Sequence, residues 1–428
     1  MEKLYLGVGR EIITPKVGCQ LYGYSPDVFS TSVNDDLTVS AFYLRQGDTQ
    51  ALMISVTVCL ISTALADEIL TKIQNEYNIP KTCCILSATH THSGPNTAGQ
   101  EGWGDIDREY CEGIFIPRIL SAVRAAVADP VPVKMGVSSG DSLVGINRRE
   151  LNYENAIKFG QNPWGAYDPK MTVISFKGED EKTVASIVHY GAHGTAAGKN
   201  QEITRDWSGI MTDALGGVSA FFNGPEGDVG PRISNGKTVG DITYVRELGE
   251  IAARDAATLY DKTDAYRDAT LLTSHKLLKI PLCQRISKAE ALKMLEPLKG
   301  QTVNHRGMTR AHLEQVLKSY EQGYADKEFC EVPQTLIAIG DIVFASFPYE
   351  LFSEIGMRIG KEIKTKTVLS LSNANGSEGY FVTEDALCRG GYEVTMFLYG
   401  HLQRCVDNAD FHLMRESVKH IKDLINEE

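Results

Sequence analysis

Two histidines in residues 87–95 are the first candidates for chemistry. The segment reads Ser-Ala-Thr-His-Thr-His-Ser-Gly-Pro and places His90 and His92 two positions apart. In an extended chain, residues i and i+2 point to the same side, so both imidazoles can face one cavity. Imidazole is a common zinc ligand, and a second imidazole can move protons near neutral pH. The alternative is that each histidine is a hydrogen-bonded polar residue at a strand end.

A second apolar segment also leads into a histidine loop. Residues 187–190 contain His189 and precede a glycine-containing loop with His193. Two strands that each deliver a histidine to a loop predict a metal site at one edge of a sheet. His189 lies inside the predicted strand, where burial and a hydrogen bond explain it without a ligand role. The pattern therefore favours His193 as the metal ligand.

Three further segments carry groups that can line a site. Residues 222–231 form a glycine-dense loop, which lets the backbone approach a ligand and offers N–H groups to an oxyanion. Glu350 follows a predicted strand, and its carboxylate also has the plain role of a charge at a helix start. Residues 373–399 are polar and aromatic among glycines, as pocket-lining loops are. Composition alone favours an ordinary connecting loop for the first segment, and many surface loops are similar to the last one.

The elements that must position these residues follow from hydrophobic patterning. Strands are predicted at residues 37–44, 51–61, 83–89, 131–137, 171–177, 184–190 and 334–347. Helices are predicted at residues 62–78, 107–129, 244–260, 287–298, 309–323, 350–364 and 408–426. A Gly47-Asp48 turn predicts a hairpin between the first two strands, and Pro117 predicts a kink or break in the second helix. The alternation indicates an α/β fold in one domain over residues 1–428, with a helical insertion or lid at about 275–330.

Composition narrows the classes of partner and compartment. A formal net charge of −12 with no basic run argues against nucleic acid and against stable association with an anionic membrane. The apolar run at 51–61 is too short to span a bilayer, and the first residues lack the apolar stretch of a signal peptide. Nine cysteines without a CxxC spacing indicate reduced thiols. We therefore expect a cytoplasmic protein that acts on a small molecule; the oligomeric state stays open.

In this order, the segments resemble the catalytic domain of the neutral, non-lysosomal ceramidases. Residues 88–95 match the family's Ala-Thr-His-Thr-His-Ser-Gly-Pro motif letter for letter, and residues 7–15 resemble its G-x-G-x-x-D-I-T-P opening with Ile12 in place of Asp. Further segments similar to family motifs are Asn147-Arg148, His193-Gly194-Thr195, residues 205–209, Tyr349-Glu350, Asn375-Gly376, residues 379–383 and residues 390–393. The resemblance implies two stacked mixed β-sheets flanked by helices.

The resemblance also implies a site. It implies one zinc ion held by His90, His193, Glu350 and Tyr380, whose nitrogen and oxygen donors suit Zn²⁺.

The resemblance further assigns the residues around the ion. It makes His92 a proton-transfer residue and gives Arg148 and Tyr392 the role of holding or polarising the scissile carbonyl, with Asp228 shaping the pocket. The family's loop reads G-D-V-S-P with a reactive serine, whereas Gly230 stands at that position here. Without that hydroxyl, water activated by zinc is the expected nucleophile.

Three functions are consistent with these residues. The first is a zinc-dependent hydrolase that cleaves an amide, ester or lactone bond of a small polar substrate other than ceramide. The second is a zinc-dependent lyase or isomerase acting on a sugar-like acid, in which the metal stabilises an enolate. The third is a non-catalytic, metal-dependent binding protein of the same fold, favoured by the missing serine and opposed by the retention of His92, Arg148 and Tyr392.

Overall fold

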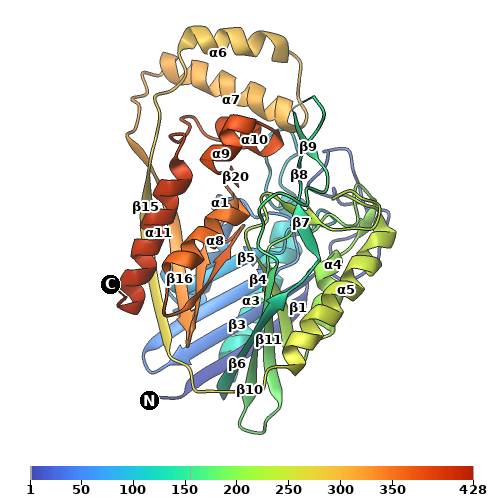
Figure 1. The fold of residues 1–428 in the computed structure, drawn as a ribbon, viewed down its shortest axis with the longest axis vertical. Coiled ribbons are helices and arrows are strands. Elements are labelled where there is room, and N and C mark those ends of the chain that lie inside the picture. The colour runs from blue at the N-terminus through green and yellow to red at the C-terminus, as the bar shows by residue number, and fades with distance from the viewer. Residues whose placement is uncertain (1, 155, 428) are drawn as a thin grey trace.

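Two β-sheets, stacked face to face between layers of helices, form the centre of the molecule (Figure 1). The computed structural model describes residues 2–154 and 156–427. The larger sheet has the strand order β13-β11-β10-β6-β1-β3-β4-β5, and the smaller one has the order β15-β16-β17-β19. Most neighbouring strands are antiparallel, while β4–β5, β11–β13 and β17–β19 are parallel. The expected α/β class with two stacked mixed sheets is confirmed.

The strands of the two sheets have well-defined bounds. The larger sheet comprises β1 (Leu4–Ile12), β3 (Thr38–Gln46), β4 (Thr49–Val56), β5 (Cys84–Ala88), β6 (Val131–Asp141), β10 (Lys170–Gly178), β11 (Thr183–Tyr190) and β13 (Val218–Asn223). The smaller sheet comprises β15 (Leu271–Pro281), β16 (Phe329–Ile339), β17 (Ile342–Ser346) and β19 (Thr367–Leu371). β3 and β4 pair as the predicted hairpin, with Gln46 opposite Thr49.

Side-chain alternation along the strands builds two cores. In β3, Val39 and Ala41 face the helices, whereas Phe42 and Leu44 face the smaller sheet. Successive strand residues point to opposite faces, so a strand buried on both faces is apolar throughout. The contact between the two sheets is therefore a dry layer, and the polar residues of the site lie at the strand ends.

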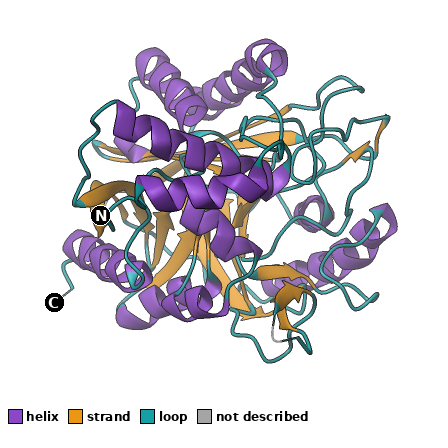
Figure 2. Ribbon diagram, turned by 90° about the horizontal axis from the view of Figure 1, so that it is seen from above, coloured by secondary structure: helices purple, strands orange, loops and turns teal. Residues whose placement is uncertain are grey.

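Helices cover the outer faces of both sheets, as the view in Figure 2 shows. The helices are α1 (Thr63–Tyr77), α2 (Arg108–Tyr110), α3 (Ile116–Ala128), α4 (Trp207–Asp213), α5 (Ile242–Asp261), α6 (Lys288–Leu295), α7 (Asn304–Glu321), α8 (Ser353–Glu362), α9 (Glu384–Arg389), α10 (Tyr392–Tyr399) and α11 (Ala409–Ile425). α1 begins at the Ser62 cap, whose side chain accepts from Leu65 N, and ends at left-handed Asn78. α3 packs on β1 and β3, and α8 and α11 pack on the smaller sheet.

Among the described residues, four two-stranded pairs lie outside the main sheets, and three of them carry or flank site residues. The pairs are β2 (Ser32–Val33) with β12 (Glu202–Ile203), β7 (Gly145–Asn147) with β14 (Val229–Pro231), β8 (Arg149–Leu151) with β9 (Ile157–Phe159), and β18 (Glu350–Leu351) with β20 (Tyr380–Phe381). None of these short strands was predicted; β14 lies in the predicted glycine-dense loop, and β18 lies at the predicted start of a helix.

Three predicted elements differ from the structure. The single strand at 334–347 is two antiparallel strands, β16 and β17, because Gly340 has a positive φ of 56° and closes a tight turn between them. The helix at 350–364 begins only at Ser353, because Glu350 is paired in β18. The helix at 107–129 is interrupted by a π turn at Cys111–Phe115 just before Pro117, which is the predicted break.

The region expected as a helical insertion or lid contains a helical hairpin. β15 occupies its first residues, and α6 and α7 follow, packed through Ala291, Leu313 and Val316. Figure 1 shows α6 and α7 at the top of the molecule, above α10. The His305 ring of α7 lies 6.0 Å from the Tyr392 ring of α10. In the described residues, no helix is both long and apolar enough to cross a membrane.

Candidate metal and catalytic centre

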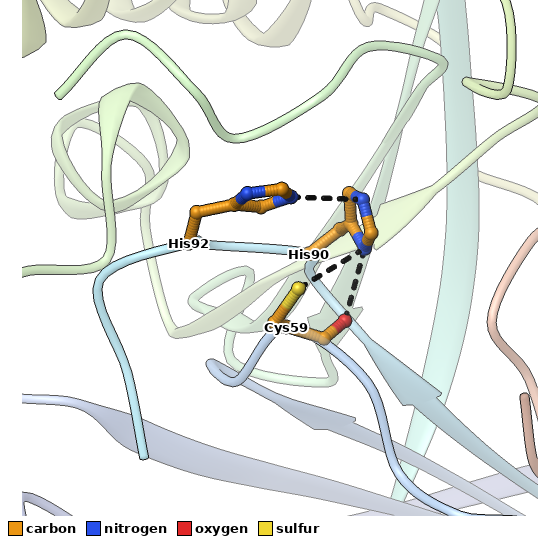
Figure 3. Close-up of side chains that lie close together, drawn as sticks. All are labelled: Cys59, His90 and His92. Carbon is orange, nitrogen blue, oxygen red and sulfur yellow. Dashed lines mark hydrogen bonds between the residues drawn. The ribbon is translucent and has the colours of Figure 1, made fainter. Parts of the chain in front are cut away.

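His90 enters the site through an unusual backbone conformation. β5 ends at Ala88, and His90 has a φ of 68°, in the left-handed region. The prediction that two extended residues would share a face was therefore wrong in its reason, although the two imidazoles do meet: His92 Nε2 lies 3.2 Å from His90 Nε2 (Figure 3). His90 Nδ1 lies 3.0 Å from the Cys59 carbonyl oxygen. A carbonyl only accepts, so Nδ1 carries a proton, and in the neutral ring Nε2 offers its lone pair.

His193 reaches the same point from the end of β11. Its loop forms a bridge in which Thr91 pairs with Gly194, and His92 N donates to the Gly194 carbonyl at 3.1 Å. A Cβ at position 194 would lie 2.6 Å from the His90 carbonyl oxygen, so this close approach requires glycine. His193 Nδ1 donates to the Glu226 carbonyl at 2.9 Å. The Nε2 lone pair of His193 is therefore also directed into the site.

Glu350 and Tyr380 arrive together on the β18–β20 pair, where they are direct partners. Glu350 Oε2 lies 3.1 Å from His193 Nε2 and 3.4 Å from His90 Nε2. Tyr380 Oη lies 3.4 Å from His193 Nε2. The alternative reading of Glu350 as a helix-start charge is wrong, because the carboxylate points to the imidazoles. The structure thus brings all four expected ligands together.

These donors fit a small divalent cation. Zinc bonds of about 2.0–2.1 Å in a tetrahedron place donor atoms about 3.3 Å apart, which matches the measured separations. Glu350 Oε2 is buried and has no hydrogen-bond partner in residues 2–154 and 156–427, although two imidazole nitrogens lie beside it. Burial lowers the pKa of His193 to about 3, so its imidazole is neutral. Burial opposes ionisation of Glu350, but His90 and His193 outweigh it and hold the pKa well below its usual range.

His92 stands beside the ligands with one nitrogen unused. Its Nδ1 is buried and has no hydrogen-bond partner within the described chain. The Tyr24 ring lies 5.0 Å away, and a Cβ at Gly23 would fall 2.4 Å from Nδ1, so this loop closes tightly over the imidazole. Burial, with His90 and His193, holds the pKa of His92 well below its usual range. His92 is thus a neutral imidazole available to accept a proton.

Arg148 places a fixed positive charge at the edge of the centre. Its Nε donates to Glu393 Oε1 at 3.0 Å, and its Nη2 donates to Tyr380 Oη at 2.9 Å. The guanidinium also lies over the Phe159 ring, 4.8 Å from its centroid. Glu393 accepts from Arg149 as well, so the two buried arginines share one carboxylate. This pairing fixes Arg148 and leaves a net positive charge beside the ligands.

Tyr392 begins α10 and is positioned by aromatic rings. Ring centroids lie at 5.4 Å from Phe159 and 5.8 Å from Tyr380. Its hydroxyl makes no hydrogen bond within the described residues and is therefore free to meet a ligand. Burial and the nearby Glu350 raise the pKa of Tyr392, so the group is a neutral phenol that can donate.

Asp228 has a different position from the other expected catalytic residues. Its carboxylate accepts from Ser353 N at 2.7 Å, from Ser353 Oγ at 3.0 Å and from Asn147 Nδ2 at 3.2 Å. Its carbonyl accepts from Arg148 N at 2.8 Å. Burial raises the pKa of Asp228 to about 6. These contacts hold the start of α8 and the chain at Arg148, so the carboxylate acts on the frame of the site.

Gly230 has no room for a side chain. It pairs with Ile146 in the β7–β14 bridge, and a Cβ there would lie 2.6 Å from Thr238 Cβ. Thr238 therefore fills the space that a residue larger than glycine would need. The packing of this loop therefore favours glycine over serine at position 230.

Sequence reasoning missed several residues around the centre and judged one correctly. Cys59, Glu226 and Asn373 surround the outer side of the His90 imidazole; Cys59 Sγ lies 3.7 Å from His90 Nδ1 (Figure 3). A carboxylate inside the glycine-dense loop, near the predicted Asp228, was the one available signal for Glu226. His189 is buried and its Nε2 donates to the Ser370 carbonyl at 2.9 Å, as expected of a structural histidine.

Known proteins share this fold and its sequence motifs. A family model described as neutral/alkaline non-lysosomal ceramidase, N-terminal, matches residues 4–238, more than half of the chain. The chain belongs to this ceramidase family. Its members include hydrolases, and the match spans the loops of His90, Arg148, His193 and Asp228.

Solved ceramidase structures extend the likeness to the whole chain. The neutral ceramidase from Pseudomonas aeruginosa has 18% identity and a TM-score of 0.77, with 99% of this chain and 75% of that chain covered. A ceramidase complexed with C2 has 17% identity and a TM-score of 0.72, with 99% of this chain and 76% of that chain covered. At these identities the structures show the ceramidase fold. Family and fold together indicate a hydrolase.

Proposed function

We propose that this member of the ceramidase family is a zinc-dependent hydrolase that cleaves an amide, ester or lactone bond of a small polar substrate. The observation that carries the proposal is the convergence of His90, His193 and Glu350, whose ligand atoms lie within 4.8 Å of one another. Tyr380 Oη completes a four-donor set. When bound there, zinc supplies Lewis acidity, which polarises a carbonyl and makes water more acidic.

The residues around the centre would transfer protons and stabilise negative charge. His92 accepts a proton from the attacking water and returns it to the leaving group through Nε2, the nitrogen that faces the ligands, because its imidazole is neutral. Arg148 and Tyr392 donate to the carbonyl oxygen of the substrate as negative charge develops on it. Both donors are held in place before the substrate binds, Arg148 by Glu393 and Tyr392 by neighbouring rings.

Asp228 contributes through position. By holding Ser353 and the backbone of Arg148, its carboxylate and carbonyl keep two sides of the site in register. A family serine is absent at Gly230, so no side-chain hydroxyl at that position competes with water as the nucleophile.

A cavity lined by residues that neighbour the site residues in sequence favours a small polar substrate. A cavity of about 270 Å³ is lined by Leu60, which follows Cys59, and by Gly379, which precedes Tyr380. Its polar lining includes Gln100, Glu101, Gln315 and Glu378. Such a lining suits hydroxyl and amine groups better than a long acyl chain, because buried polar groups lose free energy when they are left unpaired. The acidic net charge of the chain likewise favours a small-molecule substrate over nucleic acid or an anionic membrane.

The test combines metal content, turnover and isotope incorporation. The purified protein is analysed for zinc and incubated with a panel of polar amides, esters and lactones in ¹⁸O-labelled water. We expect one zinc per chain and one ¹⁸O atom in the acid product. Turnover without ¹⁸O would instead support the lyase or isomerase, and zinc without turnover would support the binding protein.

A matched variant sharpens this test. Tyr392→Phe removes only the free hydroxyl and keeps the ring packing. We expect unchanged zinc content and turnover about 100-fold lower, the size of effect seen when one oxyanion donor is lost. Unchanged turnover would remove Tyr392 from the mechanism.

A further inference from the structure

Glu226 is a fully buried carboxylate that the proposed mechanism does not use. It lies in the loop between β13 and β14 and is 0% exposed. Its Oε1 accepts from Asn373 Nδ2 at 2.6 Å, while its Oε2 has no hydrogen-bond partner within the described residues. It makes no salt bridge to any described lysine, arginine or histidine. Such a group needs a physical explanation, because an unpaired buried charge costs several kcal/mol.

The same residue is linked to both imidazole ligands. The Glu226 carbonyl accepts from His193 Nδ1 at 2.9 Å, which fixes the tautomer and the direction of that ring. The carboxylate holds the Asn373 amide, whose Nδ2 packs 3.3 Å from His90 Nδ1. Both nitrogens carry hydrogen, so this contact fixes the position of the ring and is not a hydrogen bond. Glu226 thus reaches one ligand through its backbone and the other through Asn373.

Asn373 is well placed to transmit this contact. It adopts a φ of 47°, which asparagine tolerates better than most residues. Its N–H donates to the Tyr349 carbonyl at 3.0 Å, and its carbonyl accepts from Ala88 N at 3.1 Å. Asn373 therefore joins the end of β5, which leads to His90, to the residue before Glu350. A shift of its side chain would therefore displace both His90 and Glu350.

Charge gives a second reason for a carboxylate here. Two neutral imidazoles and the single carboxylate of Glu350 leave a divalent cation with one uncompensated positive charge, to which Arg148 adds. In a buried site, a second carboxylate behind His90 offsets that charge, since electrostatic interactions are weakly screened there. The cation in turn offsets the cost of burying Glu226.

We propose that Glu226 is a positioning residue of the metal centre, which orients His193 and His90 and raises the affinity for a divalent cation. This inference rests on the proposed metal centre and adds a role to a residue outside the ligand set. The carboxylate acts on His90 through Asn373, so the two side chains form one functional unit.

The experiment measures zinc affinity. Metal-free full-length protein is titrated with zinc in competition with a chromogenic chelator, for the wild type, Glu226→Gln, Glu226→Ala and Asn373→Ala. We expect the apparent Kd to rise about 10-fold in Glu226→Gln, which loses the charge, and about 100-fold in Glu226→Ala, which also releases Asn373. Asp410→Asn is the matched control, because Asp410 is also buried with one unpaired carboxylate oxygen and lies on α11. Its zinc affinity should equal that of the wild type.

Coupling separates positioning from a merely structural role. If Glu226 acts through Asn373, the effects of the two substitutions should not multiply. The zinc Kd of the Glu226→Gln/Asn373→Ala double variant should then lie within about 3-fold of the Kd of Asn373→Ala. Thermal unfolding of the metal-free proteins shows whether each variant folds. If Glu226→Ala does not fold, the test uses Glu226→Gln and Asn373→Ala. Wild-type affinity in folded Glu226→Gln and Asn373→Ala, or fully multiplicative effects, would overturn the inference. A wild type that binds no zinc would instead refute the proposed metal centre.

Discussion

The proposed metal centre and His420 of α11 both contain buried imidazoles, but the hydrogen bonding of these imidazoles differs. His420 is 1% exposed, and both of its nitrogens have partners: Nδ1 lies 3.0 Å from Gln334 Oε1 and Nε2 lies 2.9 Å from Ser274 Oγ. In the proposed metal centre, the atoms His92 Nδ1 and Glu350 Oε2 are also buried, and they have no partner among the described residues. Buried polar atoms are normally paired, and the unpaired Glu350 Oε2 lies beside two imidazole nitrogens, an arrangement that suits a cation.

The same contrast holds within five residues of one chain segment. His189, inside β11, donates to a backbone carbonyl and has no access to the centre. His193, just beyond the strand, also donates through one nitrogen but directs the other at Glu350. Burial alone does not separate the two histidines. The direction of the second nitrogen does.

Removing a candidate metal ligand should have the largest effect on zinc binding and turnover. We expect His193→Ala and His90→Ala each to abolish stoichiometric zinc binding, and turnover with it, because two of the four donors are imidazoles. His189→Gln and His420→Gln should keep one zinc per chain, as measured by metal analysis after dialysis. Full zinc retention in both alanine variants would show that the metal lies elsewhere.

Removing the adjacent imidazole should separate binding from chemistry. We expect His92→Ala to keep zinc and to lose turnover by roughly 10²–10⁴-fold, the usual contribution of a general acid or base. Steady-state kinetics and metal analysis of the same preparation provide the measurement. Zinc loss in this variant would move His92 into the ligand set.

Restoring the family serine should act on packing. We expect Gly230→Ser to lower the free energy of unfolding by roughly 1–3 kcal/mol, because its Cβ would overlap Thr238. The double variant Gly230→Ser/Thr238→Ala should recover much of this loss in chemical denaturation. Neither variant should cleave ceramide, and robust cleavage would show that the glycine alone excludes that substrate.

His420, whose two nitrogens are both paired, should affect only the pH dependence of the free energy of unfolding. Burial lowers the pKa of His420 to about 4, below the value of about 6.5 for an unfolded chain. Protons therefore bind the unfolded state more readily, so this contribution to stability is complete above about pH 6.5 and is lost as the pH falls towards 4. We expect His420→Gln to lose roughly 1–2 kcal/mol less than the wild type over this range. Parallel curves would contradict the assignment.

Local patterns in the sequence predicted much of the fold. Four-residue periodicity and the Ser62 and Asn78 caps define α1, and the Gly47-Asp48 turn defines the β3–β4 hairpin, because these signals act between near neighbours. The predictions that failed involved competition at element ends. Residues 342–346 pair with β16 and β19, and Glu350 pairs with Tyr380, so tertiary pairing outweighed local helix and strand preference.

For the site, the sequence by itself determined which residues could bind a metal. The family motifs implied His90, His193, Glu350 and Tyr380 as ligands, and the His90–His92 spacing indicated that two imidazoles can lie close together. Only the tertiary structure decided how they meet. The left-handed turn at His90, the space taken by Thr238 next to Gly230, and the contact of Glu226 with Asn373 depend on residues up to 147 positions apart. Sequence spacing carries no information on such contacts, because packing of the sheets and loops, and not local preference, brings those side chains together.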